Sequence, residues 1–241
     1  MQSSVKSTIA DFFAYNCVTF FTRNLVRRIP KLYLVNMKVV ATNIGEKRTV
    51  DWKGQEVVTG IFKYPVDGGI VLEKTDVKSD AVVDRKYHGG VDKACYAYSL
   101  DFYDHWKELH PDLDWDYGMM GENLTIEGLD EKSLSIGDVY KVGEAIIEVS
   151  QPRQPCFKLN VRLSSSLAVK QFVKFGRSGA YFRVLKDGKV QAGDVFELQT
   201  KGEPQLTVYD VFQMVYGGGD DSMREIARNH AALSVDTKMA L

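Results

Sequence analysis

Short apolar runs separated by glycine and polar turns dominate the chain from residue 37 to residue 203. Runs of about four to eight residues that are rich in valine, isoleucine and aromatic side chains are typical of β-strands. The pattern predicts strands at residues 38–44, 49–52, 56–59, 70–73, 94–98, 123–126, 139–142, 145–150, 180–185 and 195–199. Lys53-Gly54-Gln55 predicts a hairpin turn between the second and third of these strands. Because so many short strands would otherwise expose their edges, we expect a closed or nearly closed β-barrel.

Helical patterns are the minority in this part of the chain. Residues 100–110 predict one helix. Residues 165–175 predict a second helix, which opens on serines suited to N-capping and ends at Gly176. The predicted fold class is therefore mainly β with minor α.

A small helical module is expected at residues 204–241. Apolar residues recur there at helical spacing, at Leu206, Val208, Val211, Phe212 and Val215. Three glycines at 217–219 interrupt the pattern, residues 222–230 predict a second helix, and residues 234–241 leave room for a shortened third. The module is either a partner-docking or lid element or, as is more usual for amphipathic helices, a cap that buries its apolar face on the barrel.

The first 36 residues differ in composition from the rest. They contain the single acid Asp11 against five basic residues, which are Lys6, Arg23, Arg27, Arg28 and Lys31. Their apolar stretch is too short for a membrane span, and they show only weak features of a targeting peptide. We expect Met37 to be the natural start and residues 1–36 to be a non-native or disordered extension. The expected organisation is thus an extension at 1–36, a β-barrel domain at 37–203 and the helical module at 204–241.

The charge balance narrows the classes of partner. Among 241 residues, 31 lysines and arginines face 32 aspartates and glutamates, so the chain has no global basic field of the kind that draws proteins onto nucleic acid or anionic lipid. We expect neither a nucleic-acid partner nor a membrane partner. Cys17, Cys95 and Cys156 are widely spaced without a C-x-x-C pair, which argues against a disulfide scaffold or a structural zinc site and predicts a cytoplasmic location. The sequence leaves the oligomeric state open.

Cys156 is the most informative residue of the chain. It ends the segment Gln151-Pro152-Arg153-Gln154-Pro155-Cys156, in which each proline restricts its own φ and the conformation of the residue before it. Cations at 153, 158 and 162 favour a thiolate, which is both the nucleophilic form of cysteine and a ligand for soft metals. The segment therefore indicates a reactive or metal-binding thiol, although a buried free cysteine after a turn is the commoner arrangement.

A second cluster lies at residues 85–93. It places a histidine before paired glycines and an aspartate, with cations on both sides, and its candidate residues are Arg85, Lys86, His88, Gly89, Gly90 and Asp92. Glycines let backbone N–H groups approach a ligand, and cations suit an anion such as phosphate. A third cluster contains Glu122 and Asn123 at the start of a predicted strand. Considered alone, either cluster is more often an ordinary turn.

Taken in chain order, these segments resemble the MOSC domain, a family named after the C-terminal domain of molybdenum cofactor sulfurases. The resemblance rests on Lys86-Tyr87-His88-Gly89-Gly90 with Asp92, Gly121-Glu122-Asn123-Leu124, Ile136-Gly137-Asp138 and the proline segment that ends at Cys156. It extends over residues 37–199. The tail from Pro204 is similar to the three-helix module of bacterial reductases of N-hydroxylated purines.

The resemblance implies a mixed β-barrel that binds a molybdenum cofactor of the molybdopterin type. Cys156 is then the protein ligand to molybdenum, in keeping with the preference of such centres for thiolates. The residues implied to bind the cofactor are Arg85, Lys86, His88, Gly89, Gly90, Asp92, Asn123, Arg153 and Lys158. His88 and Glu122 are the candidates for a general acid and, with Cys156, form the implied catalytic set.

The implied activity is reduction of small N-hydroxylated compounds, such as hydroxylaminopurines. No ferredoxin-like or flavin-binding segment is recognisable in the sequence, so we expect a separate reductase to donate the electrons. A rival interpretation is a non-catalytic carrier of the cofactor or of sulfur, with a persulfide or a transient ligand on Cys156. A link to pyridoxal phosphate, suggested by the family name, is the weakest interpretation, because a domain for that cofactor does not fit in this length.

Overall fold

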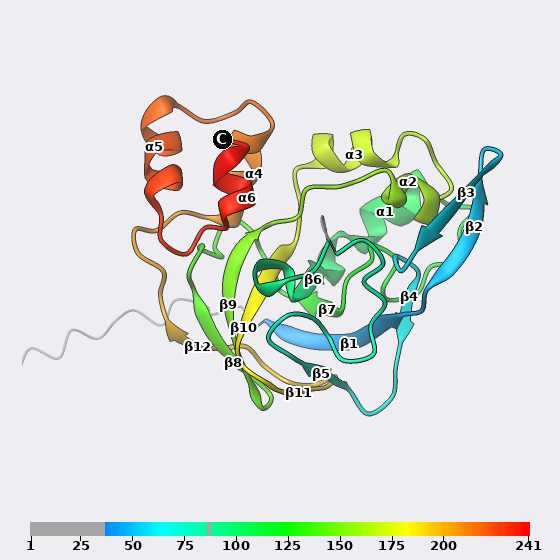
Figure 1. Cartoon of the computed structure of the whole chain (residues 1–241), viewed down its shortest axis with the longest axis horizontal. Coiled ribbons are helices and arrows are strands. Elements are labelled where there is room, and N and C mark those ends of the chain that lie inside the picture. The colour runs from blue at the N-terminus through cyan, green and yellow to red at the C-terminus, as the bar shows by residue number, and fades with distance from the viewer. Residues whose placement is uncertain (1–36, 86–87) are drawn as a thin grey trace, which may run out of the picture. The chain divides into compact units, whose positions relative to one another are not determined.

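Strands make up most of the fold (Figure 1). A computed structural model describes residues 37–85 and 88–241, so the predictions for residues 1–36 and for Lys86 lie outside the described residues. The strands are β1 (Lys38–Gly45), β2 (Arg48–Trp52), β3 (Gln55–Thr59), β4 (Lys63–Pro65), β5 (Ile70–Leu72), β6 (Cys95–Ser99), β7 (Leu124–Glu127), β8 (Val139–Val142), β9 (Ala145–Pro152), β10 (Ala180–Lys186), β11 (Gly188–Val190) and β12 (Glu197–Thr200). The prediction of a mainly β fold is confirmed. The sequence pattern missed only the short strands β4 and β11.

Eight strands form one mixed sheet in the order β12-β8-β9-β10-β6-β7-β1-β4. Within it, β6 and β7 are parallel and the other pairs are antiparallel. The sequence predicts a closed or nearly closed barrel, and the sheet does not close completely. The backbone N–H of Val39 donates to the carbonyl of Asp194 (2.8 Å), and that of Phe196 donates to the carbonyl of Met37 (2.9 Å). These bonds form an isolated bridge between β1 and the segment before β12, and a continuous ladder is absent there in the described part of the chain.

The hairpin of β2 and β3 has the turn that its sequence predicts. Trp52 pairs with Gln55, so the loop consists of Lys53 and Gly54. Both loop residues have positive φ, 58° and 78°, as the two-residue turns that fit the twist of a hairpin require. The hairpin extends away from the large sheet (Figure 1).

The helices of the barrel region are short. They are the 3₁₀ turns η1 (Val91–Lys93) and η2 (Leu100–Phe102) and the α-helices α1 (Tyr103–Leu109), α2 (Lys158–Arg162) and α3 (Ala168–Phe175). The prediction that Gly176 ends α3 is confirmed, because it adopts a left-handed φ of 72° there. The predicted serine N-cap is wrong, since Leu167 occupies that position without a side-chain bond. The sequence pattern also missed α2.

Three helices follow Pro204, as the sequence predicts: α4 (Val208–Val215), α5 (Asp221–Asn229) and α6 (Val235–Met239). The first begins with a capping box, in which the Thr207 side chain accepts from the N–H of Asp210 and the Asp210 carboxylate accepts from the N–H of Thr207. Among residues 37–85 and 88–241, no helix is both long and apolar enough to cross a membrane.

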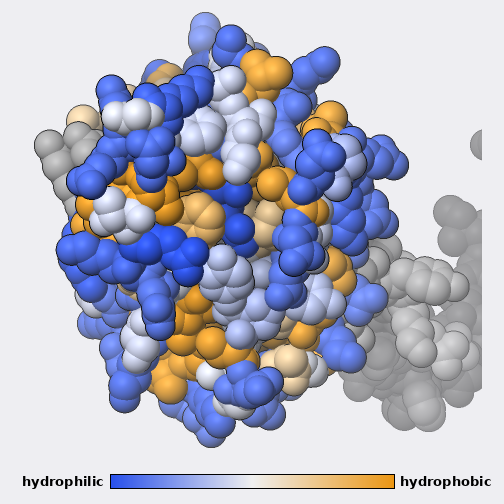
Figure 2. Space-filling model, turned by 90° about the vertical axis from the view of Figure 1, so that its right-hand side faces the viewer, coloured by the Kyte–Doolittle hydropathy of each residue, from blue (hydrophilic) through white to orange (hydrophobic). Residues whose placement is uncertain are grey.

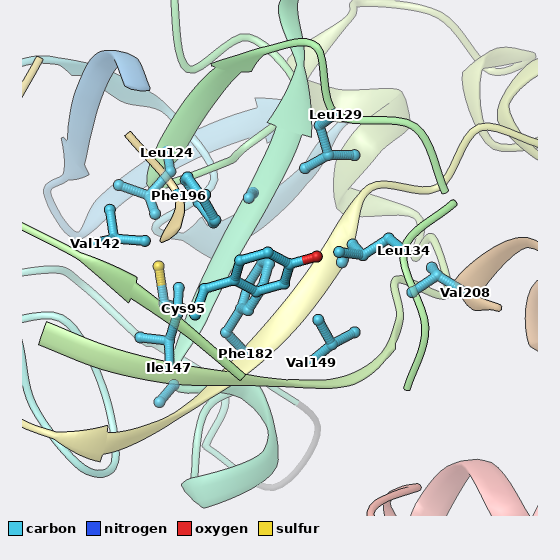
Figure 3. Close-up of a cluster of buried hydrophobic side chains, with 14 of the residues drawn as sticks. Cys95, Leu124, Leu129, Leu134, Val142, Ile147, Val149, Phe182, Phe196 and Val208 are labelled. Carbon is cyan, nitrogen blue, oxygen red and sulfur yellow. The ribbon is translucent and has the colours of Figure 1, made fainter. Parts of the chain in front are cut away.

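The hydrophobic core joins the strands to the first helix of the module. Figure 3 shows Cys95 of β6, Phe182 of β10 and Ile147 of β9 directed toward one another, with Val208 of α4 at the edge of the same cluster. A second cluster contains many aromatic rings and lies around α1 and α3, with Tyr98, Trp106 and Phe172 fully buried. Cys95 is sealed in the first cluster, and burial raises the pKa of its thiol, which makes it an inert structural residue.

Candidate functional site

Cys156 lies between the end of β9 and the start of α2. The strand ends at Pro152, and the carbonyl of Cys156 accepts from the N–H of Leu159 (2.9 Å) as the chain turns into the helix. The side chain is half-buried, in contrast to the sealed Cys95. The thiol is therefore held between two regular elements and remains accessible.

Two connected spaces meet at Cys156. The inner cavity has a volume of about 100 Å³, and the outer groove has a volume of about 630 Å³, within the range usual for small-molecule sites. Residues that line both spaces are Asp84, His88, Lys93, Cys156, Lys158 and Tyr181. The two spaces therefore adjoin each other at the thiol.

The glycine-rich segment forms one wall of the inner cavity. His88 and Gly89 line it, and Gly89 has a φ of 100° at a place where a β-carbon would lie 2.9 Å from Cγ1 of Val82. Only glycine fits that position without strain. Burial, and then the positive charges of Arg153 and Lys158, lower the pKa of His88 to about 4, so its imidazole is neutral at pH 7.

Arg153 brings a buried positive charge to the same cavity. Its side chain is 6 % exposed, and its guanidinium lies over the rings of Tyr96 (4.8 Å) and Phe172 (5.6 Å). It also donates a hydrogen bond to the carbonyl of Met120. These contacts fix the orientation of the guanidinium, as cation–π stacking commonly does for arginine.

A buried ion pair that the sequence pattern did not indicate also lines the inner cavity. Lys63 and Asp80 line the inner cavity and bind each other, with side chains only 9 % and 3 % exposed. Asp80 also accepts from Nδ2 of Asn123 (3.0 Å) and from the N–H of Gly45 (2.8 Å). Tyr96 and Tyr181 complete this wall and were likewise missed. No local motif marks these residues, because each comes from a separate segment.

Some predicted residues lie elsewhere. Arg85 is exposed and pairs with Asp76 (2.6 Å), and Asp92 pairs with Nε of Arg183 (2.5 Å); neither lines the cavity or the groove. Gly90 also lies outside the lining, and its N–H donates to the carbonyl of Thr75 (3.1 Å).

Glu122 has a structural environment. It is fully buried and does not line either space. Its carboxylate accepts from the hydroxyls of Tyr103 and Thr125 and from the backbone N–H groups of Gly118 (3.0 Å) and Met120 (3.0 Å). These four hydrogen bonds occupy both carboxylate oxygens and hold the loop together, and the carboxylate does not contact the inner cavity.

The helical module also reaches the groove. Asp236 of α6 lines the outer groove and pairs with Lys93 (2.9 Å). Arg183 of β10 binds Asp92 and Glu148 and also donates to the carbonyl of Ala232 (2.7 Å), which lies in the module. Asp92 and Lys93, which follow Gly89 and Gly90, are thus bound to the sheet and to the helical module, respectively.

This fold and site define a MOSC domain protein. The sequence model of the MOSC domain matches residues 84–197, which contain the glycine wall, Arg153 and Cys156. The chain is 38% identical over 171 residues to the uncharacterized protein YflK of Bacillus subtilis, covering 70% of this chain and 76% of that one. The chain belongs to the MOSC domain family, which is associated with binding of the molybdenum cofactor.

Further similarities support the assignment. The crystal structure of YiiM from Geobacillus stearothermophilus superposes with a TM-score of 0.71 at 31% identity, over 84% of this chain and 96% of that one. YiiM of Escherichia coli is 34% identical over 145 residues, covering 59% of this chain and 65% of that protein. A Gibberella moniliformis protein named reductase is 36% identical over 166 residues, 67% of this chain, and the match spans 29% of its length. The link to pyridoxal phosphate, the weakest interpretation of the sequence, finds no support among these similarities.

Proposed function

We propose that the chain binds a molybdopterin-type molybdenum cofactor through Cys156 and reduces small N-hydroxylated compounds. The observation that carries the proposal is the position of Cys156, a half-buried thiol at the junction of two connected spaces. The similarity to a protein named reductase supports an oxidoreductase.

The donor set fits a metal that is held mainly by its own organic ligand. Within the described ranges, no group of three or more histidine, cysteine, aspartate or glutamate side chains is arranged to hold a metal ion. A single thiolate cannot by itself form a metal centre of protein ligands, but it suits a metal that arrives with a dithiolene. Oε1 of Gln151 lines the same groove, is buried, and has no hydrogen-bond partner in the part of the chain that the structure describes. Such an unpaired acceptor is available for a donor on a ligand.

The charges of the inner cavity suit an anionic ligand. Four cationic side chains line it, Lys63, Lys93, Arg153 and Lys158, against the carboxylates of Asp80 and Asp84. Lys158 starts α2 two residues after Cys156, and Arg153 precedes Cys156 by three. We assign to them the binding of the cofactor's anionic oxygens.

The reaction converts an N–OH group, two electrons and two protons into N–H and water. The bound cofactor supplies the two-electron chemistry, and a separate reductase provides the electrons. His88 is neutral at pH 7 and lines the space next to Cys156, so it can hold the substrate by a hydrogen bond without adding a charge. Because its carboxylate accepts four hydrogen bonds and lines neither space, we assign Glu122 to positioning the loop before β7 and not to donating a proton.

Metal analysis of Cys156→Ala tests the ligand assignment. Protein produced in a host that makes the cofactor should contain near-stoichiometric molybdenum, and the variant should lose it. The control is Cys95→Ala, which removes the sealed thiol and should keep the metal in the folded fraction. Equal molybdenum in wild type and Cys156→Ala would contradict the assignment.

A turnover assay separates the reductase from a cofactor or sulfur carrier. Metal-loaded protein with an artificial electron donor should reduce hydroxylaminopurine or an amidoxime. If the loaded protein leaves both compounds unchanged, the reductase proposal fails and the carrier remains.

A further inference from the structure

Two arginines from distant parts of the chain lie over the same pair of aromatic rings. The guanidinium carbon of Arg48 lies 5.0 Å from the ring centre of Phe62 and 5.5 Å from that of Tyr64. The corresponding distances for Arg162 are 5.1 and 5.5 Å. Figure 2 shows the face that carries the β2–β3 hairpin, where strongly hydrophilic residues lie between hydrophobic ones. We call Arg48, Arg162, Phe62 and Tyr64 the arginine pair site.

Neither arginine forms an ion pair within residues 37–85 and 88–241. The ion pairs of these ranges include neither Arg48 nor Arg162. Arg48 donates one long hydrogen bond, to the hydroxyl of Tyr64 (3.4 Å). Arg162 is only 8 % exposed, and its Nε is sealed without any partner among the described residues.

The positive charges of Arg48 and Arg162 repel each other, and an anion bound beside them would offset that repulsion. Burial is the main cause that lowers the pKa of Arg162; Tyr64, Glu122 and Tyr103 oppose the shift, and the charge of Arg48 adds to it. The terminal nitrogens of Arg162 make no hydrogen bond to the described part of the chain, yet only its Nε is sealed there, so they remain accessible. Each guanidinium presents a planar fork of N–H donors that can bind two phosphate oxygens, and both groups lie over the same pair of rings.

The arginine pair site adjoins the inner cavity. Phe62 stands between Ile61 and Lys63 in the chain; those two residues line the cavity, whereas Phe62 and Tyr64 lie outside its lining. Arg162 follows Lys158, another lining residue, by one turn of α2. A molecule in the cavity with a charged extension would therefore have this site beside it.

We propose that Arg48 and Arg162 form a binding site for a phosphate group of a small molecule. Tyr64, which is 42 % exposed, supplies a hydroxyl that accepts from Arg48 and has its own proton free for a phosphate oxygen. The phosphate belongs either to a nucleotide-like substrate or to the cofactor. Both sources rest on the proposed function, whereas phosphate binding itself does not.

The test measures binding of inorganic phosphate to the purified full chain by calorimetry, at constant ionic strength with chloride as the balancing anion. Arg48→Gln removes a charge from a hairpin strand and should weaken phosphate binding about tenfold or more, because a hydrogen bond to a charged group contributes at least about 1.5 kcal/mol. Lys53→Gln removes a charge from the tip of the same hairpin and should leave binding unchanged. Arg162→Lys keeps the charge and loses the fork, so it should also weaken binding.

Two further measurements identify the source of the phosphate. If adenosine 5′-monophosphate binds more tightly than adenosine only when Arg48 is present, while molybdenum content is equal, the phosphate belongs to a substrate. If Arg48→Gln lowers molybdenum content, it belongs to the cofactor. Phosphate binding that is absent, or equal in wild type and Arg48→Gln, overturns the proposal even if the protein is an active reductase.

Discussion

Replacing Glu122 by glutamine distinguishes a structural carboxylate from a catalytic one. Oε1 accepts from Tyr103, Gly118 and Thr125, and Oε2 accepts from the N–H of Met120. A glutamine of the same shape has one oxygen and one NH₂ group. In either orientation of the amide, its NH₂ group faces a backbone N–H donor, that of Gly118 or that of Met120, in a place closed to water.

The cost follows from the number of groups left unpaired. With the NH₂ at the Oε2 position, the Met120 N–H and the amide each lose a partner, and an unsatisfied buried group costs about 1–3 kcal/mol. The expected loss of unfolding free energy is therefore about 2–6 kcal/mol. For a domain of this size, that corresponds to a fall in Tm of about 4–24 °C.

Urea unfolding followed by circular dichroism measures this loss directly. Thr125→Val is the matched control, because it removes one of the three donors to Oε1 and should cost about 1 kcal/mol. If the Glu122→Gln protein unfolds at the wild-type midpoint but reduces N-hydroxylated compounds much more slowly, the structural role is refuted and Glu122 acts in the chemistry.

Two predictions concern the cavity wall and the sheet. In protein without cofactor, NMR titration should show a His88 pKa of about 4. This folded pKa lies below the unfolded value of about 6.5, so the unfolded state takes up the proton first as pH falls. The free energy of unfolding should therefore fall as pH falls from about 6.5 to 4. His88→Gln should lose less stability over that window, and an equal loss would contradict the titration. Gly179→Ala should lower the free energy of unfolding by about 2–5 kcal/mol in chemical denaturation, because φ is 63° and a β-carbon would overlap the Ala97 carbonyl. The control is Gly54→Ala, where φ is 78° but the space around the β-carbon is open, and the loss should be about 1 kcal/mol. Equal costs for the two would show that φ alone sets the penalty.

The sequence predicted the elements whose information is local. Short apolar runs located ten strands, and Lys53-Gly54-Gln55 located the β2–β3 turn. Of the residues predicted to form the site, the cavity or groove is lined by Cys156, His88, Gly89, Asn123, Arg153 and Lys158. Their roles toward a cofactor stay predictions.

Information that depends on distant pairings could not be extracted from one sequence. Lys63 and Asp80 are 17 positions apart, and Arg48 and Arg162 meet only because β2 and α2 fold together. Closure of the sheet likewise depends on how the segment before β12 meets β1, which strand propensities do not encode. Glu122 illustrates a different limit of sequence-based prediction. A polar residue in a motif can accept hydrogen bonds from backbone groups instead of binding a ligand.

The shared core has a practical consequence for dissecting this protein. Leu206, Val208 and Val211 belong to the same buried cluster as Phe182 and Ile147 of the sheet. A recombinant fragment that stops at residue 203 would expose apolar surface of the strands to water and would tend to precipitate. Crystallographers and enzymologists should therefore express both parts together, and loss of activity in a truncated version would say nothing about whether the tail participates in turnover.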